Sequence, residues 1–483
     1  MNTSAPWPDL ETAELRVRRM QRKLHHWAVD DPGRRFDDVF NLVHDPAFLA
    51  VAWERVRTNK GARSAGADGI VPRFLGPQES VLMLEALHAQ VKQRRFRPDP
   101  VREVMIPKTN GKLRRLGIAT AADRVVQASL KLVLEPIFEA DFRSCSYGFR
   151  PRRRAQDAIA EIHYLASGTR AYHWVFEGDI EACFDEIDHT ALMERVRARI
   201  GDKRVLALVK SFLKAGILAK DLTFRSNATG TPQGGILSPL LANIALSVLD
   251  EHFAAKWEAL GPYWTRAKYR RAGGATMKIV RYADDFVVMV HGDRADAEAL
   301  RAEVAAVLAP IGLRLSAEKT RVCHIDEGFE FLGFRIQRQT KRGTAKKYVY
   351  TWPSKKALAS VIDKVRMVTR RHKHRTLADL LHRLNPVLRG WCSYFQHGVS
   401  KRTFSYLDHY AWWKVVDWMR KRHHGLAWGV FRRRFLPGWQ IRDGRTAMFR
   451  PWEVEVTRYR FRGYDIATPW SWREPGIVTA TTA

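Results

Sequence analysis

The chain has 483 residues, of which 46% are hydrophobic, so it can bury a sizeable core and is not globally disordered. Its 82 Lys and Arg residues and 51 Asp and Glu residues give a net charge of +31. A charge this large indicates a polyanionic partner, for which nucleic acid is favoured over an anionic membrane surface. Four scattered cysteines without a CxxC pair exclude a disulfide framework and a zinc ribbon, and no apolar stretch reaches the roughly 18 residues of a membrane span.

The first third of the chain is predicted to begin with helices and to end in a strand. Residues 1–60 have the pattern of a basic helical extension, which ends at the turn-rich stretch 59–66. An amphipathic helix is predicted from Asp123 onward, because apolar residues recur there at helical spacing. The apolar run 174–180 is typical of a strand, and it carries Asp179 near its end.

Helices and strands alternate through the middle of the chain. We predict helices from Thr190 onward and over 237–253, paired strands around Asp284 and Asp285, and a surface helix over 293–309. Because helical and strand patterns alternate in this region, we expect an α+β or α/β core.

The composition changes after about residue 340. Between Lys341 and Arg450 there are 26 Lys and Arg residues against 5 Asp and Glu, a net charge of +21. Apolar residues recur at helical spacing over 358–365 and 377–384, so we predict a mostly helical appendage whose basic faces bind nucleic acid. The basic run 370–375 fits this role, although such runs are also typical of a solvated surface.

The pair Asp284-Asp285 lies between apolar strand sequences, where acids are disfavoured and adjacent carboxylates repel each other. A divalent cation would neutralise the pair, since Mg²⁺ prefers one or two carboxylates together with substrate phosphates. Two such ions about 3.5–4 Å apart catalyse phosphoryl transfer, but they need a further carboxylate, for which Asp179 is the candidate. The alternative for a lone acidic pair is a solvated turn.

Six stretches of the sequence resemble the motifs of one family. YADD at 282–285 resembles a metal-binding box, GDIEACF at 178–184 a first palm motif, and LNPVLRGWCSYF at 384–395 a maturase-specific X domain. The matches to a nucleotide-supporting loop, a fingers motif and a primer-holding hairpin are TGTPQGGILSP at 229–239, IPKTNGKLRRLGI at 106–118 and FLGF at 331–334. In this order and spacing they resemble the reverse transcriptase/maturase proteins encoded by group II introns.

The resemblance implies an α+β fold, a right-hand polymerase whose fingers and antiparallel palm sheet occupy 61–340. A helical thumb and maturase X domain would follow over 341–400, and a basic, DNA-binding-like region over 401–483. Residues 1–60 would be an N-terminal extension. No HNH-type endonuclease is expected, because residues 459–483 contain neither Cys nor His.

The resemblance also implies roles for individual residues at the metal site. Asp179, Asp284 and Asp285 would hold two Mg²⁺ ions, or Mn²⁺ in their place, with the Ile180 carbonyl as an extra ligand. Phe184 would pack under the deoxyribose, where its ring would collide with a 2′-hydroxyl and so favour dNTPs. The alternative for Phe184 is a core aromatic.

The resemblance places further residues around the incoming nucleotide. Lys108 and Arg114 correspond to positions that clamp the triphosphate, with Arg115 as an alternative to Arg114. Gln233 lies in the glycine-rich loop that supports the templating base and the nucleotide, or else forms a structural turn there. Lys319 corresponds to a position that protonates the departing pyrophosphate, unless it is a surface lysine.

The basic appendage is expected to bind folded intron RNA through phosphates, 2′-hydroxyls and unpaired bases. Trp412, Trp413 and Trp418 are candidate stacking platforms, but their helical spacing favours a core role. The fingers segment departs from the family at Arg154 and Gln156, where a Ser and a His are usual. The residues expected to contact nucleic acid are Arg370, Arg371, Lys373, Arg375, Arg432, Arg433 and Arg434. The last three of these are expected to contact target DNA.

The motifs together imply an RNA-directed DNA polymerase and maturase that binds its group II intron RNA, assists splicing and copies the intron into DNA during retrohoming. Its partners would be the intron RNA, target DNA with a primer, and dNTPs. Its place would be the cytoplasm of a bacterium, and the nucleoid when it is bound to DNA, with no membrane partner. Two alternatives stay open: a splicing factor without polymerase activity, and a related reverse transcriptase recruited to phage defence or CRISPR adaptation.

Overall fold

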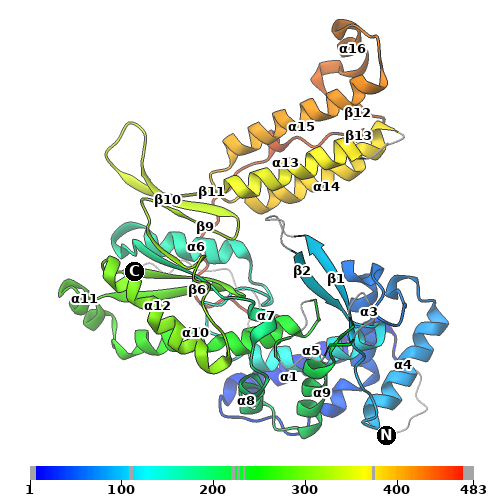
Figure 1. Ribbon diagram of the computed structural model, residues 1–483, viewed down its shortest axis with the longest axis vertical. Helices are drawn as coiled ribbons and strands as arrows, with labels where there is room; N and C mark the ends of the chain where they lie inside the picture. Colours follow the sequence, from blue (N-terminus) through cyan, green and yellow to red (C-terminus); the bar gives the residue numbers. More distant parts are fainter. Residues whose placement is uncertain are drawn as a thin grey trace.

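The computed structural model describes residues 7–107, 113–218, 224–225, 229–231, 234–371 and 376–471. They form a broad body from which an elongated helical arm projects (Figure 1). The body combines helices with mainly antiparallel sheets, which confirms the predicted α+β class. Within the described ranges, the structure contains no helix with the length and apolarity that crossing a membrane requires.

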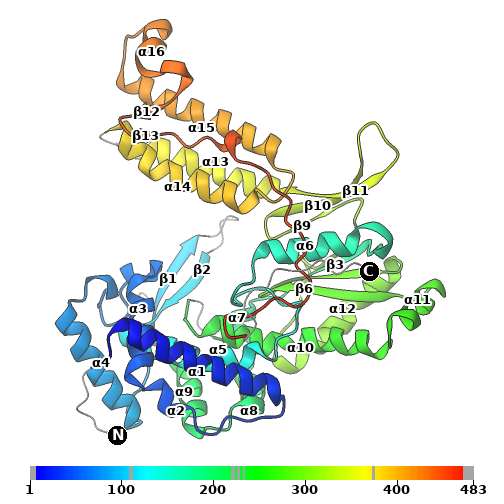
Figure 2. The ribbon, with the colours of Figure 1, turned by 180° about the vertical axis from the view of Figure 1, so that it is seen from behind.

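One side of the body is a group of helices that pack around α5 (Ala121–Glu139) (Figure 2). The helix α5 is buried along almost its whole length, and the hydroxyl of Thr120 caps its start by accepting from the Asp123 N–H at 3.1 Å. The other members of this side are α1 (Leu10–Asp30), α2 (Phe40–Val43), α3 (Pro46–Thr58), α4 (Pro77–Lys92), α8 (His189–Arg199) and α9 (Lys203–Lys214), with the 3-10 turns η1 (Lys60–Arg63) and η2 (Pro72–Phe74).

The other side of the body contains a four-stranded antiparallel sheet with the strand order β6-β7-β3-β8. Successive residues of β7 enter two different cores, since Val288 packs with helices α10 and α12 while Met289 packs with α6. Both faces are covered, which explains the continuous apolar run in this strand. The elements are β3 (Trp174–Asp179), β6 (Thr276–Tyr282), β7 (Asp285–His291), β8 (Arg321–His324), α6 (Ala155–Ala166), α7 (Cys183–Glu186), α10 (Ser238–Ala259), α11 (Tyr263–Arg271) and α12 (Arg294–Leu308), with η3 (Gly168–Arg170) and η4 (Ala309–Ile311).

A second sheet has the strand order β2-β1-β4-β5. The strands β1 (Val101–Pro107) and β2 (Leu113–Ile118) pair antiparallel, and β1 also pairs in parallel with β4 (Ile217–Leu218), which is followed by β5 (Phe224–Arg225). The β1-β2 hairpin projects from the helical side toward the arm (Figures 1 and 2). The described residues of the motif at 106–118 therefore lie on a hairpin that points from the body toward the arm (Figures 1 and 2).

A third sheet, β11-β10-β9, joins the body to the arm. Leu332 and Gly333 form the tight turn between β9 and β10, both with positive φ, which confirms the hairpin expected there. One apolar core continues from this sheet into the arm helices, as the contact of Phe334 with Phe395 illustrates. The elements are β9 (Phe329–Phe331), β10 (Phe334–Thr340), β11 (Lys347–Pro353), α13 (Lys355–Arg371), α14 (Leu377–Phe395), α15 (Lys401–Arg422), α16 (Trp428–Phe435), β12 (Arg442–Asp443) and β13 (Thr446–Ala447), with η5 (Pro437–Trp439) and η6 (Pro451–Glu453).

The last described residues, 454–471, return from the arm to the body as an irregular strap (Figure 2). Arg462 in the strap donates two hydrogen bonds of 2.7 Å to the buried carboxylate of Asp157 in α6. Farther along, the indole Nε1 of Trp470 donates to the side-chain oxygen of Gln21 in α1 at 3.3 Å. The strap therefore connects both sides of the body with the arm.

Candidate active site

Three acids that are far apart in the sequence meet at one edge of the four-stranded sheet. Asp179 is the last residue of β3 and Asp285 the first of β7, and the two are directly paired in the antiparallel register. Asp284 lies beside them in the two-residue turn between β6 and β7, where Ala283 has a left-handed φ of 59°. The pairing of β3 with β7 therefore brings the three carboxyl groups to one place.

The negative charges of these acids oppose one another. Desolvation, followed by repulsion from Asp284 and Asp179, raises the pKa of Asp285 to about 6, even though its side chain reaches the surface. Desolvation is also the main cause that raises the pKa of Asp284, and the charge of Asp179 adds to it. A bound cation would relieve this repulsion, so the electrostatics of the edge favour one.

The acids fit divalent cations in their chemistry, because Mg²⁺ takes hard oxygen ligands such as carboxylates. In the part of the chain that the structure describes, however, no three His, Cys, Asp or Glu side chains already converge as a metal-ligand group. Asp179 is instead turned toward Lys319, whose Nζ donates to Asp179 Oδ2 at 2.9 Å. A cation held by all three acids would therefore compete with Lys319 for Asp179.

The end of β3 is held by the loop that precedes Lys319. The Ser316 N–H donates to the Asp179 carbonyl at 2.8 Å, and the Glu181 N–H donates to the Arg314 carbonyl at 2.9 Å. These two bonds bridge Ile180 to Leu315 without using the carbonyl of Ile180. That carbonyl, the predicted extra ligand, therefore remains outside the bridge.

Phe184 lies in the short helix α7, directly after the acid-bearing end of β3. Its side chain is half-buried and packs against the main core of the body. Its carbonyl accepts the Thr231 N–H at 2.6 Å, and Gly230, with a φ of 78°, approaches so closely that a Cβ would lie 2.5 Å from backbone atoms of Asp185. The glycine-rich loop is thus fastened to α7, while Gln233 in that loop lies outside the described residues.

The two neighbouring arginines of β2 face different groups. Arg115 is near Glu103 of β1, with 3.8 Å between Arg115 Nε and Glu103 Oε1. The charge of Arg114, in contrast, is close enough to the acids to lower the pKa values of Asp284 and Asp285, against the larger effect of desolvation. The charge of Arg114 therefore acts on the acidic edge, and Lys108 lies outside the described residues.

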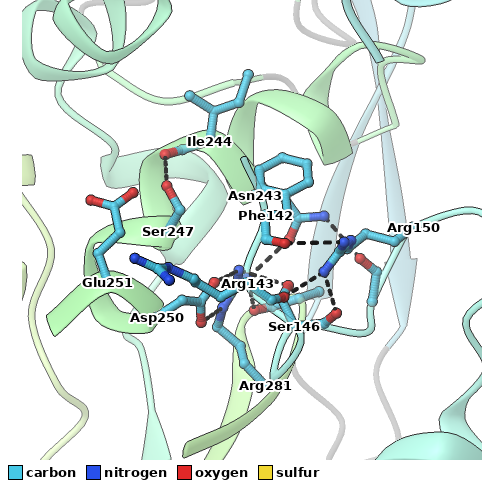
Figure 3. A network of polar contacts seen from close by, with 12 residues as sticks. Phe142, Arg143, Ser146, Arg150, Asn243, Ile244, Ser247, Asp250, Glu251 and Arg281 are labelled. Atoms are coloured by element: carbon cyan, nitrogen blue, oxygen red, sulfur yellow. Dashed lines mark hydrogen bonds and ion pairs between the residues drawn. The ribbon is translucent and has the colours of Figure 1, made fainter. Parts of the chain in front are cut away.

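A fully buried arginine, which the sequence analysis did not select, supports the acidic turn (Figure 3). Arg281 precedes the turn in β6, and its guanidinium donates to Asp250 Oδ1 at 2.8 Å and to Asn243 Oδ1 at 2.9 Å. It also donates to the Ala283 carbonyl at 3.0 Å and to the Ser146 hydroxyl at 2.8 Å. The charge is thus paired inside the protein and fixed to the turn backbone.

The segment around Ser146 supports the same turn from another direction. The Tyr147 N–H donates to the Arg281 carbonyl at 2.8 Å, and the Asn243 amide donates to the Gly148 carbonyl at 2.8 Å. A Cβ at Gly148 would lie 2.3 Å from the backbone nitrogen of Ala283, so only glycine fits without moving the turn. One sequence signal could have indicated this network, namely an arginine that directly follows the apolar pair Ile279-Val280 and precedes the acidic turn.

Comparison with known proteins agrees with this geometry. A family model described as "Reverse transcriptase (RNA-dependent DNA polymerase)" matches residues 106–336, and one described as "Group II intron, maturase-specific domain" matches residues 358–435. Protein YkfC of Escherichia coli (strain K12) is 38% identical over 71% of the chain and 93% of that protein. Group II intron-encoded protein LtrA of Lactococcus lactis subsp. cremoris is 28% identical over 88% of the chain and 80% of that protein.

The chain belongs to the group II intron-encoded reverse transcriptases and maturases. It is accordingly an RNA-directed DNA polymerase as well as an intron maturase. The family uses divalent metal ions, which agrees with the acid-rich edge. A more distant relative, Nuclear intron maturase 1, mitochondrial, of Arabidopsis thaliana, is 28% identical over 45% of the chain and 40% of that protein.

In this reverse transcriptase, the basic residues predicted to bind nucleic acid lie away from the acidic edge. Arg370 is exposed near the end of α13, while Arg432, Arg433 and Arg434 are exposed on α16 at the far end of the arm (Figure 1). Lys373, Arg375 and the side chain of Arg371 lie outside the described residues. The structure therefore separates the exposed cations of the arm from the acids.

The two departures from the family motif have identifiable local contacts. Arg154 stands at the N-cap of α6, where its backbone N–H donates to Asp157 Oδ2 at 2.7 Å. The Gln156 amide donates to the Tyr394 carbonyl of α14 at 2.9 Å. Gln156 therefore links the body to the arm.

Proposed function

We propose that the sheet edge with Asp179, Asp284 and Asp285 is the polymerase active site and holds two divalent cations, Mg²⁺ or Mn²⁺, with the Ile180 carbonyl as a further ligand. The observation that carries this proposal is the direct pairing of Asp179 with Asp285 beside the Asp284 turn. When bound, such cations activate a primer 3′-hydroxyl and stabilise the pyrophosphate that leaves.

Two cationic side chains at this edge would interact with the phosphates of the substrate. Arg114 would bind the triphosphate of the incoming dNTP with Lys108, since a guanidinium offers a forked set of donors to phosphate oxygens. We assign this role to Arg114 rather than Arg115, because Arg115 is directed to Glu103. Lys319 would leave Asp179 when the site is loaded and would then donate a proton to the departing pyrophosphate.

Phe184 and Gln233 would act on the sugar and the base of the same nucleotide. Phe184 would pack under the deoxyribose and exclude a 2′-hydroxyl, and Gln233 would support the base pair from the glycine-rich loop. The hydrogen bond from Thr231 to the Phe184 carbonyl supports a shared role, because it fixes the loop to α7.

We further propose that the molecule is a right-hand polymerase. Residues 61–340 would contain the fingers with the β1-β2 hairpin and the palm with the four-stranded sheet, and 341–400 the thumb and maturase X domain. Residues 401–483 would be the basic DNA-binding-like region and 1–60 an extension. The predicted contacts with intron RNA and target DNA would come from Arg370, Arg371, Lys373, Arg375, Arg432, Arg433 and Arg434.

In this arrangement, the intron RNA template, the DNA primer and the dNTPs would meet between the arm and the acidic edge. The protein would work in the cytoplasm of a bacterium and at the nucleoid when it is bound to DNA. Relatives in Escherichia coli and Lactococcus lactis support the bacterial setting.

The test is the variant Asp284→Asn, which removes one charge from the acidic edge with little change of shape. We expect primer extension on an RNA template to fall by at least about a thousandfold, while assistance to intron splicing is largely kept. Asp363→Asn is the matched control, because Asp363 is an exposed acid of α13. Loss of both activities in the Asp284 variant, or of neither, would contradict separate catalytic and RNA-binding surfaces.

A further inference from the structure

The arm carries an open groove lined with tryptophan that is separate from the acidic edge. Its volume is about 470 Å³, and it lies between α15 and the turns η5 and η6. We call it the tryptophan groove and define it by the residues Trp412, Trp413, Trp439, Trp452, Asp408 and Arg450.

Three of its four indole rings are exposed to solvent. Trp413 is 40% exposed, Trp439 is 49% exposed and Trp452 is 45% exposed, whereas Trp412 is buried. Isolated exposed apolar residues are ordinary, but a contiguous group of exposed aromatics marks a binding surface. The exposure of these rings in one groove therefore indicates a ligand.

The groove is preformed by contacts within the arm. The Trp412 Nε1 donates to the Trp439 carbonyl at 3.1 Å, and the two rings lie 6.0 Å apart at 48°. Trp413 is in turn stacked on Trp428 of α16 with 6.0 Å between ring centres. Trp412, Trp413 and Trp439 are thus held in place before any ligand arrives, which lowers the entropic cost of binding.

The rim of the groove is positively charged. The Arg432 guanidinium lies 5.0 Å from the ring centre of Trp439, and the Lys401 Nζ lies 6.0 Å from that of Trp452. Asp408, the one acid among the residues that define the groove, is neutralised by two hydrogen bonds of 2.9 Å from Arg450. Flat aromatic faces beside cations suit a ligand with flat rings and negative charge.

We propose that the tryptophan groove binds unpaired nucleobases of an RNA strand by stacking, with the rim cations on the adjoining phosphates. An unpaired base offers its face to an aromatic side chain, whereas a duplex hides it, and phosphates alone would require no tryptophan. The choice of RNA rests on the proposed function, and the match of the maturase-specific family model to residues 358–435, which include Trp412 and Trp413, supports it.

The direct experiment is photo-crosslinking of the full chain to a single-stranded uridine 12-mer that contains 5-iodouridine. Mass spectrometry of the peptides should place crosslinks at Trp413, Trp439 or Trp452. Crosslinks that map only to residues outside the tryptophan groove would overturn the assignment.

A binding series isolates the contribution of the bases. Fluorescence anisotropy compares the uridine 12-mer with an abasic 12-mer that has the same phosphates. The double variant Trp439→Ala/Trp452→Ala should weaken binding of the uridine oligomer by about tenfold and leave the abasic oligomer unchanged. The variant Trp439→Phe/Trp452→Phe should retain most of the affinity, because phenylalanine can still stack on a base. The control is Trp264→Ala, which removes an exposed tryptophan of α11, outside the groove. Equal weakening for both oligomers would overturn stacking, and tighter binding of oligothymidine would overturn the assignment to RNA.

Primer extension distinguishes failure of this inference from failure of the proposed active site. The double alanine variant should extend a primer already annealed to an RNA template at the wild-type rate, because the groove is remote from the acidic edge. Wild-type protein that crosslinks in the groove without extending a primer would refute the proposed active site alone. Primer extension without crosslinks in the groove would refute the groove alone.

Discussion

The acidic edge of the four-stranded sheet and the arm both depend on charge, but they hold it in opposite ways. At the edge the charges are few and crowded, and the buried Arg281 fixes the turn that carries Asp284. On α16 the charges are exposed and repeated, as Arg432 and Arg433 show. Catalysis depends on position, whereas phosphate binding depends mainly on charge density. Single substitutions should therefore have large effects at the edge and small effects on the arm.

After Asp284→Asn, the largest effect in this comparison is expected for Arg281→Met. The change removes the donor to the Ala283 carbonyl and leaves Asp250 buried without its partner. Breaking such a pair costs about 3–5 kcal/mol of the free energy of unfolding. Displacement of the acidic turn should reduce primer extension by about a hundredfold. Thermal unfolding and single-turnover primer extension measure the two effects.

The double variant Arg281→Met/Asp250→Leu separates stability from positioning. Apolar replacement of both partners should recover most of the free energy of unfolding, because no buried charge is left unpaired. Primer extension should stay low and should require more Mg²⁺, because the Ala283 carbonyl still lacks its donor. Wild-type activity in this double variant would show that Arg281 stabilises the fold without positioning the acids.

A smaller effect at the same edge is expected for Gly148→Ala. The new Cβ would lie 2.3 Å from the Ala283 nitrogen, so the turn must shift by a fraction of an ångström. We expect primer extension to fall by about tenfold. Gly390→Ala in α14 is the matched control, since a Cβ there meets nothing within 4 Å. Equal activity of both variants would mean that the turn tolerates displacement.

The smallest effect is expected on the arm. Arg433→Gln should weaken binding of target DNA by about threefold and lower the number of salt ions released on binding by about one. Arg294→Gln on α12, an exposed arginine of the body, is the control. Filter binding over a series of salt concentrations measures both quantities. If this one change lowered the binding affinity by a hundredfold or more, the proposed difference between the arm and the acidic edge would be wrong.

The elements around the site could be predicted from local patterns. The strand predicted over 174–180 is β3, and the helices predicted from Thr190, over 237–253 and over 293–309 are α8, α10 and α12. The paired strands around Asp284 and Asp285 form the hairpin of β6 and β7. Periodicity sufficed here because each element buries one face, and the apolar residues of that face recur at a fixed spacing in the local sequence.

Partners that are distant in the sequence could not be predicted in this way. Asp250 looks like a surface acid of α10, and only the packing of α10 on β6 shows that it pairs with Arg281. Asp157 and Arg462 are likewise joined only by the path of the strap. Helical spacing predicted a core role for the tryptophans of α15, which holds for Trp412, whereas Trp413 is partly exposed.

The central claim, that Asp179, Asp284 and Asp285 share divalent cations, is tested most directly by iron-mediated cleavage of the protein. Fe²⁺ that replaces Mg²⁺ generates hydroxyl radicals in the presence of ascorbate and peroxide, and these cut the backbone close to the metal. The account predicts cuts beside Asp179 and beside the Asp284-Asp285 turn, suppressed by excess Mg²⁺ and lost in the Asp284→Asn variant. Cuts at only one of the two places, or cuts that Mg²⁺ does not suppress, would contradict it.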